Sequence, residues 1–60
     1  MNMVNANELS NLLGVSKSKA YKIIRALNKE LAEEGYITIS GKCPLSYVEE
    51  RVFGLKSHQN

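Results

Sequence analysis

The chain of 60 residues has few of the residue types from which disulfides and metal sites are built. It contains one cysteine, one histidine and no tryptophan, so it has no internal disulfide and no second Cys or His at the spacing of metal ligands. No apolar run approaches the ~20 residues that cross a membrane. The N-terminus also lacks the basic start and apolar stretch of a signal peptide. We therefore expect a cytoplasmic protein without membrane contact, metal or cofactor.

The residues that commonly act in catalysis are also sparse. The adjacent carboxylates Glu33-Glu34 and Glu49-Glu50 point about 100° apart on a helix, which suits solvated charges better than an acid–base pair. Cys43 has only His58 as a candidate base, and no third group orients such a pair. We interpret Cys43 as a small buried hydrophobe and predict that the protein is not an enzyme.

The overall composition is that of a small globular domain. Hydrophobic residues make up 43% and charged residues 23% of the chain, and the net charge is +2. No repeat, low-complexity tract or linker divides the chain. We expect one domain over residues 1–60, with an ordered core over 4–54 and a frayed tail over 55–60.

Two helices separated by a glycine turn are expected in the first half of the chain. Asn5 is a good N-cap, and Glu8 stands three residues later, where its side chain can reach back to the amide of the cap. Leucines recur at helical spacing up to position 13, and Gly14 follows as a residue that readily ends a helix. We therefore predict a helix over 5–13 whose apolar face consists of Leu9, Leu12 and Leu13.

The second helix is predicted to be long and to have two different faces. Ser16 is a strong N-cap, no Pro or Gly occurs from 17 to 34, and Gly35 then ends the helix. At about 100° per residue, its apolar residues form one stripe about 100° wide. The stripe consists of Ala20, Ile23, Ile24, Leu27 and Leu31.

A short hairpin and a third helix are expected in the remainder. Residues 36–39 are aromatic and β-branched and predict a strand, the Ser40-Gly41 pair predicts a turn, and Lys42-Cys43 predicts a short return strand that Pro44 ends. Ser46 and Glu49 match a capping box, which predicts a third helix to about Phe53, closed by Gly54. The aromatic residues expected in the core are Tyr36, Tyr47 and Phe53. This order predicts a mainly α protein with a small β-hairpin, a winged helix-turn-helix of three helices plus a wing.

The second predicted helix carries most of the positive charge. Five of the eight Lys and Arg residues fall between positions 17 and 29, with no Asp or Glu among them. A basic helical face is usually only solvated surface. This one begins directly at a capped start after a glycine turn, where a helix-turn-helix presents its reading residues to the major groove. We expect base contacts from Lys17, Ser18, Tyr21, Lys22 and Arg25, phosphate contacts from Lys19 and Lys29, and a DNA-facing position for Ser16.

The stretch NANELSNLLGVSKSKAYKII over residues 5–24 resembles the opening of excisionase-like DNA-binding domains, which are relatives of the MerR type. The Cys43-Pro44 step is similar to the entry of that family into its final helix. The resemblance implies a winged helix-turn-helix that binds DNA sites of a phage, plasmid or integrative element and either bends DNA for a recombinase or regulates transcription. It also implies a contact between the wing and DNA through Lys42.

The leading prediction is a sequence-specific double-stranded DNA-binding accessory factor or regulator of a mobile element. One module of this size buries only about 600–1,000 Å² on DNA, so we expect a homodimer or a cooperative assembly on repeated sites. The acidic segment from Glu30 to Glu34 is a candidate contact for the next copy or for a recombinase. Two alternatives stay open: a transcriptional repressor without a role in recombination, and a helix-turn-helix protein-interaction module that does not bind DNA.

Overall fold

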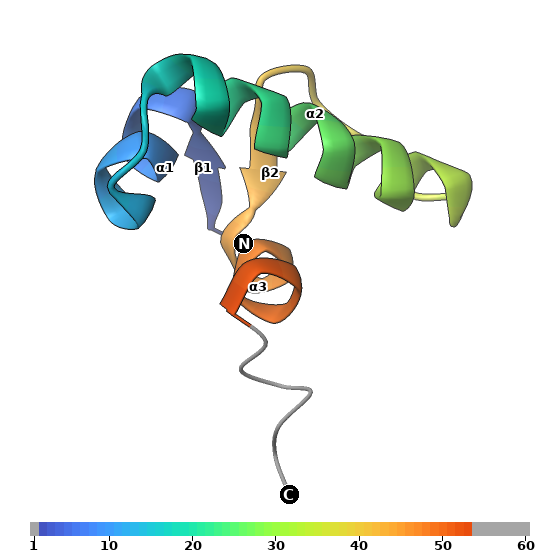
Figure 1. Ribbon diagram of the computed structural model, residues 1–60. Helices are drawn as coiled ribbons and strands as arrows, with labels where there is room; N and C mark the ends of the chain where they lie inside the picture. Colours follow the sequence, from blue (N-terminus) through green and yellow to red (C-terminus); the bar gives the residue numbers. More distant parts are fainter. Residues whose placement is uncertain (1, 54–60) are drawn as a thin grey trace, which may run out of the picture.

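The computed structural model describes residues 2–53 and has a mainly helical fold with a two-stranded antiparallel sheet. Along the chain it contains β1 (Met3–Asn5), α1 (Ala6–Leu13), α2 (Lys17–Glu33), β2 (Lys42–Pro44), α3 (Leu45–Val48) and a π-helical segment, η1 (Glu49–Phe53). In Figure 1, α2 lies across one end of the sheet and α3 lies at the opposite end of the strands. Gly54, the predicted tail and the single histidine lie outside the described residues.

The predicted start and end of the first helix are confirmed. Asn5 Oδ1 accepts a hydrogen bond from the backbone N–H of Glu8 at 2.8 Å, and Glu8 Oε1 accepts one from the backbone N–H of Asn5 at 3.0 Å. These two bonds satisfy amide groups that a free helix end leaves unpaired. At the other end, Gly14 has φ 70° and ψ 33°, the left-handed conformation that stops α1.

The predicted start of α2 is also confirmed. Ser16 Oγ accepts a hydrogen bond from the backbone N–H of Lys19 at 3.1 Å. The helix then continues without interruption to Glu33, one residue short of the predicted end. Gly35 follows with φ 95°, so a glycine again stands where the chain leaves the helix.

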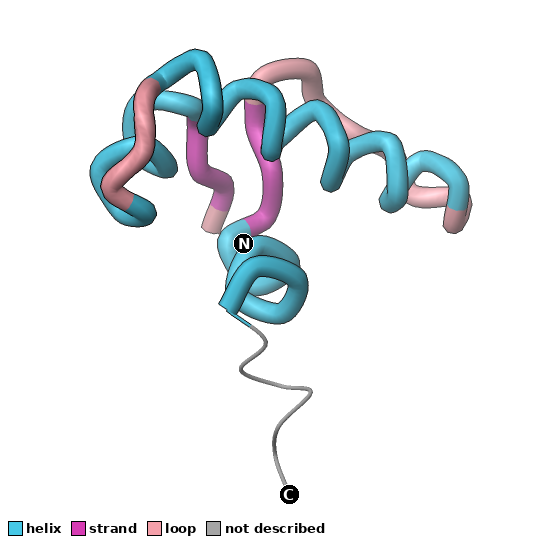
Figure 2. Tube along the Cα trace, in the orientation of Figure 1, coloured by secondary structure: helices cyan, strands magenta, loops and turns pink. Residues whose placement is uncertain are grey.

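The strand pairing differs from the expected hairpin. β2 pairs antiparallel with β1, and Val4 stands opposite Cys43 in the register. The predicted strand over 36–39 is wrong, because its one ladder contact in the described chain is an isolated bridge between Ile39 and Lys42. Pairing with β1 places Val4 against the core beside the fully buried Cys43, whereas Ile37 is 97% exposed. The loop from α2 to β2 therefore runs back along the outside of the molecule, as Figure 2 shows.

Pro44 ends β2 at a position that needs no hydrogen bond. The backbone N–H of Leu45 donates to the carbonyl of Asn2 at 2.8 Å, one step beyond the pair of Met3 and Pro44. Hydrogen-bonded and non-hydrogen-bonded pairs alternate in an antiparallel ladder, so Pro44 falls on a non-hydrogen-bonded position. Its missing N–H therefore costs no ladder bond, and the strand is short, as predicted.

The third helix begins earlier than predicted. α3 starts at Leu45, Pro44 occupies the N-cap, and no side chain caps the helix. Ser46 lies inside the first turn, so the predicted capping box from Ser46 to Glu49 is wrong. The backbone N–H of Leu45, the first amide of the helix, donates to the carbonyl of Asn2. This bond takes the place of a hydrogen bond from a helix amide to a capping side chain. The helical path continues through η1 to Phe53, as predicted.

One hydrophobic core joins β1, α1, α2, β2 and α3. Its buried members are Leu9, Ala20, Ile24, Leu27, Leu31, Cys43 and Val48, with Val4, Ala6, Leu13, Val15, Ile23 and Tyr47 partly buried against them. The apolar stripe of α2 and the burial of Cys43 are therefore confirmed. Leu12 and Tyr36 are 52% and 62% exposed, so their predicted core positions are wrong. The side chain of Phe53 lies outside the described part of the chain.

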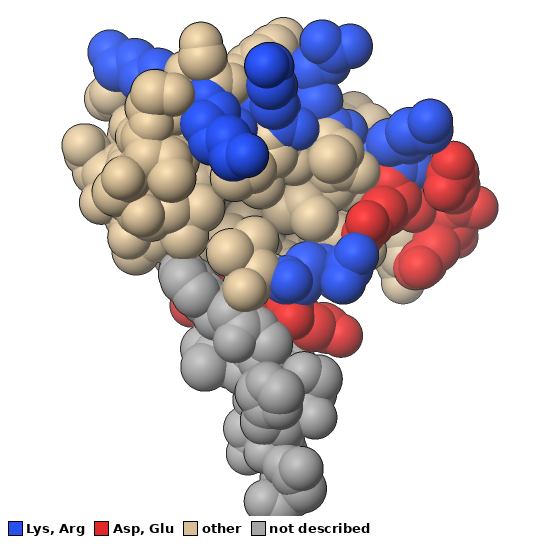
Figure 3. Space-filling view, viewed as in Figure 1, with Lys and Arg blue, Asp and Glu red and all other residues tan. Residues whose placement is uncertain are grey.

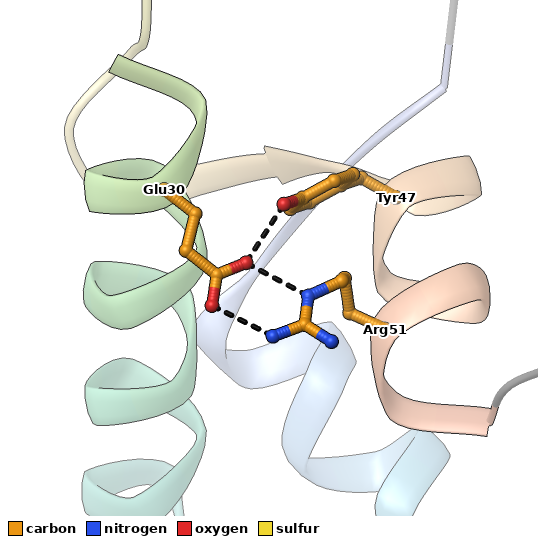
Figure 4. Close-up of polar contacts among 3 residues, drawn as sticks. All are labelled: Glu30, Tyr47 and Arg51. Atoms are coloured by element: carbon orange, nitrogen blue, oxygen red, sulfur yellow. Dashed lines mark hydrogen bonds and ion pairs between the residues drawn. The ribbon is translucent and has the colours of Figure 1, made fainter. Parts of the chain in front are cut away.

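A cluster of three polar side chains ties α2 to the last helical segment (Figure 4). Glu30 accepts a hydrogen bond from the hydroxyl of Tyr47 at 2.7 Å, and its two oxygens accept from Nε and Nη2 of Arg51, each at 2.8 Å. The Arg51 guanidinium, with a smaller contribution from the Tyr47 hydroxyl, holds the pKa of Glu30 at about 2, below its ordinary 4.5. The bonds to Glu30 raise the pKa of both partners. We call these three residues the Glu30 cluster.

The Glu30 cluster predicts a loss of stability in acid. The carboxyl has a lower pKa in the folded chain than in the unfolded chain, so its contribution is complete above pH 4.5 and is lost as the pH falls toward 2. We expect Glu30→Gln to lower the melting temperature at pH 7 and to reduce the fall in melting temperature between pH 5 and pH 2, measured by circular dichroism. Glu33→Gln, on the same helix but outside the cluster, is the control. Identical pH profiles for Glu30→Gln and the wild type would contradict this role.

Candidate nucleic-acid interface

The turn between α1 and α2 is held by backbone hydrogen bonds. The amides of Gly14 and Val15 both donate to the carbonyl of Ser10, at 2.9 Å and 3.1 Å. Ser10 is buried, and its hydroxyl donates to the carbonyl of Asn7 at 2.8 Å. Val15 is partly buried against the core. This tight connection fixes the direction in which α2 leaves α1, which is the arrangement of a helix-turn-helix.

The two faces of α2 have different surroundings. Ala20 and Ile24 are fully buried, and Leu27 and Leu31 are nearly so, because α1 and β2 pack on this side and Val48 of α3 belongs to the same core. All nine residues predicted to contact DNA are exposed. They are Ser16, Lys17, Ser18, Lys19, Tyr21, Lys22, Arg25 and Lys29 from α2 and its cap, and Lys42 from β2. The 17 residues of α2 make a rod about 25 Å long, which is compatible with entry into a major groove.

The positive charge on α2 is not neutralised by the protein. Within residues 2–53 the one ion pair joins Arg51 to Glu30, so the cations of α2 have no carboxylate partner there. Figure 3 shows Lys and Arg side chains spread over the side of the molecule that α2 forms, and glutamates gathered near its C-terminal end. One side of α2 is therefore electropositive along most of its length.

Three of these cations surround a shallow depression. Lys22, Arg25 and Lys29 line it together with Ala26, whose small side chain leaves room between them. Like charges three and four residues apart repel one another on a helix. A phosphate group in this depression would remove that repulsion and accept charge-assisted hydrogen bonds. An anion in this depression would therefore contact three cations at once.

The turn that precedes Lys42 is bonded to α2 by a residue that the sequence analysis did not single out. Asn28 Nδ2 donates to the carbonyl of Ile39 at 3.1 Å and to the carbonyl of Lys42 at 2.9 Å. The sequence does not indicate these hydrogen bonds, because the two carbonyls lie 11 and 14 residues after Asn28 in the chain. Lys42 is thereby placed beside the same helix that carries the other cations.

The C-terminal end of α2 has a second surface of a different kind. A groove there has apolar walls and an acidic rim, and we call it the acidic groove. Its lining includes Glu33, Glu34, Tyr36, Ile37, Ile39 and Glu50. The three apolar side chains are 53% to 97% exposed, which is unusual for residues of their size. The sequence predicted a strand over 36–39, and a strand in a hairpin gives no indication of an exposed apolar surface.

The described chain does not offer a site for catalysis by a metal or a thiol. No group of three His, Cys, Asp or Glu side chains within residues 2–53 could hold a metal ion. Cys43 is fully buried, and desolvation raises the pKa of its thiol, which keeps it protonated and unreactive. No helix in the described residues is long and apolar enough to cross a membrane.

Comparison with known proteins identifies a relative. The ICEBs1 excisionase of Bacillus subtilis (strain 168) is 44% identical to this chain over 45 residues, which are 75% of this chain and 70% of that protein. No protein-family model matches the chain. No solved structure matches it either.

The backbone of the turn leads to a prediction about Gly14. A Cβ added there meets no atom within 4 Å, so Gly14→Ala introduces only the strain of a φ of +70°. We expect the free energy of unfolding in urea to fall by about 1 kcal/mol, because L-residues other than Asn and Asp rarely adopt this conformation. Gly14→Asn is the control, and its free energy of unfolding should fall by less. Stabilities equal to wild type for both variants would show that the turn does not require the left-handed conformation.

Proposed function

The chain belongs to the excisionase family, and from this premise we propose that it is a DNA-binding accessory factor for the excision of a mobile element. It would bind double-stranded DNA sequence-specifically, with α2 in the major groove and no catalytic step of its own. The observation that carries this proposal is the exposed, unpaired cationic face of α2 directly after a tight, capped turn.

Within this proposal the protein is a winged helix-turn-helix whose wing is not a hairpin. The wing would be the Ser40-Gly41 turn together with β2, and its one cation is Lys42. Base contacts are assigned to Lys17, Ser18, Tyr21, Lys22 and Arg25, and phosphate contacts to Ser16, Lys19, Lys29 and Lys42. The relationship to the MerR type stays a prediction.

The alternatives use the same structure differently. A transcriptional repressor would present the same face of α2 to DNA, and it differs only in the location of its sites. A protein-interaction module that does not bind DNA would have apolar side chains on this face. The unpaired cations along α2 disfavour that module, since a protein partner would have to bury or neutralise them.

DNA reading by α2 is tested by selection from random duplexes. We expect the wild type to enrich one motif, with a salt slope of about −4 to −5 for roughly four to six phosphate contacts. Arg25→Ala should relax the preference at one base pair and lose about 1–3 kcal/mol of discrimination. Lys29→Ala should weaken binding evenly across sequences and make the slope shallower by about 1. No enrichment and no salt dependence in the wild type would reject the proposed function.

For assembly on DNA we propose a contact between neighbouring copies through the acidic groove. Glu30 lies in this region but is engaged by Tyr47 and Arg51, so the charges left for a neighbour are Glu33, Glu34 and Glu50. These acids lie at one end of α2 and the cations along the rest of it, so a second copy offers the complementary charge head to tail. The exposed apolar wall would supply the area that a stable contact requires.

The assembly proposal predicts a specific defect in Ile37→Ser. The variant should bind a single site as the wild type does, because the acidic groove is separate from the cationic face of α2. On a duplex with two adjacent sites it should lose cooperativity by about tenfold or more, since burying an isoleucine is worth about 1.5–3 kcal/mol. Leu12→Ser, which removes another exposed apolar side chain, is the control. Unchanged cooperativity in Ile37→Ser would exclude this surface as the contact between copies.

A further inference from the structure

We propose that Asn28 is a positioning residue for DNA binding: it holds the turn over 39–42 against α2 and thereby places Lys42 for a phosphate contact. The inference rests on the proposed function. It assigns to one half-buried side-chain amide the task that a β-hairpin performs in a paired wing.

The geometry of the amide supports this assignment. Its Nδ2 bonds to two carbonyls, those of Ile39 and Lys42, which stand on either side of the Ser40-Gly41 turn. The turn itself is closed by a bond from the backbone N–H of Lys42 to the carbonyl of Ile39 at 3.1 Å. Both amide hydrogens are therefore used, and each holds one arm of the same turn.

Apart from the packing of the neighbouring Cys43 in the core, few contacts fix the turn against α2. Residues 36–38 form no ladder with β2, and Ile39 contributes a single bridge. Lys42 also pairs with Asn5 in β1, which orients the strand but does not connect the turn to α2. Among the hydrogen bonds of the described residues, the two from Asn28 are the ones that join α2 to this turn.

The oxygen of the same amide gives a second, independent observation. Asn28 Oδ1 is buried and has no hydrogen-bond partner within the described structure. A buried acceptor without a donor is unfavourable, and an aliphatic side chain of similar size would avoid that cost. The Asn28 amide therefore uses both hydrogens of its Nδ2 and leaves its oxygen without a partner. This is expected if the position is required to donate hydrogen bonds to the turn.

The location of Asn28 on α2 explains why the effect would reach DNA. It stands three residues after Arg25 and directly before Lys29, at the border between the buried and the cationic faces. Because the amide bonds to the carbonyl of Lys42 itself, it holds this residue beside the cations of α2, next to the point where the buried Cys43 packs against the same helix. Lys42 would then reach a phosphate at a fixed spacing from the bases that α2 reads.

The test compares Asn28→Leu, Lys42→Ala and the double variant on the motif selected by the wild type. Each single variant should make the salt slope of binding shallower by about 1, which is the loss of one phosphate contact, while the enriched motif stays the same. The double variant should lose no more than either single variant, because both changes remove the same contact. Asn11→Leu removes an exposed amide on α1 and is the control, with a wild-type slope.

The outcomes separate the two proposals. A wild type that enriches no motif rejects the proposed function itself, whereas a wild-type slope in Asn28→Leu or additive losses in the double variant overturn only the role of Asn28. Asn28→Ala, with thermal melts of each variant, covers the case in which leucine does not fit. If both Asn28 variants fail to melt cooperatively, the residue is a stability residue and the positioning role is wrong.

Discussion

The packing of one face of α2 is the interaction on which the rest of the structure depends. Ala20 and Ile24 are fully buried, and α1, β2 and α3 meet on or around this face. A domain this small has a single core, so each element is stable only while it contacts the same helix or its immediate neighbours. Within residues 2–53 the opposite face of α2 is exposed as a consequence, and this face carries the cations.

Polar contacts add to the core at the edges of the molecule. The Glu30 cluster joins the far end of α2 to the segment after α3, and the amide of Asn28 joins the middle of α2 to the turn before β2. Both contacts originate on α2 and fix a peripheral segment at a defined distance from it. The same helix therefore organises the core, the wing and the proposed DNA-reading surface.

The charges of α2 are divided by sign along its length. Its N-terminal and middle parts are cationic without internal partners, and its last turns are acidic next to an exposed apolar groove. This division is what the two proposals use: the cationic part for contact with nucleic acid and the acidic part for contact with a neighbouring copy. The relative from Bacillus subtilis, an excisionase, is similar over 75% of the chain, which supports this interpretation of the first surface.

The amino-acid sequence by itself determined the features that depend on neighbours within one helical turn. The caps at Asn5 and Ser16, the glycine at 14 and the apolar stripe of α2 were all predictable, because each rests on contacts three or four residues apart. The exposure of the cationic face followed from the same periodicity.

Only the tertiary structure decided the features that join distant residues. It paired β2 with Met3–Asn5 and not with 36–39, exposed Tyr36 and Ile37, engaged Glu30 with Arg51, and set Asn28 against the turn. A three-residue strand has no detectable periodicity, and competing partners for β2 differ only in which side chains they bury. The partner of β2 is decided by which side chains enter the shared core. Residues from the whole chain build this core, so no local sequence pattern predicts it.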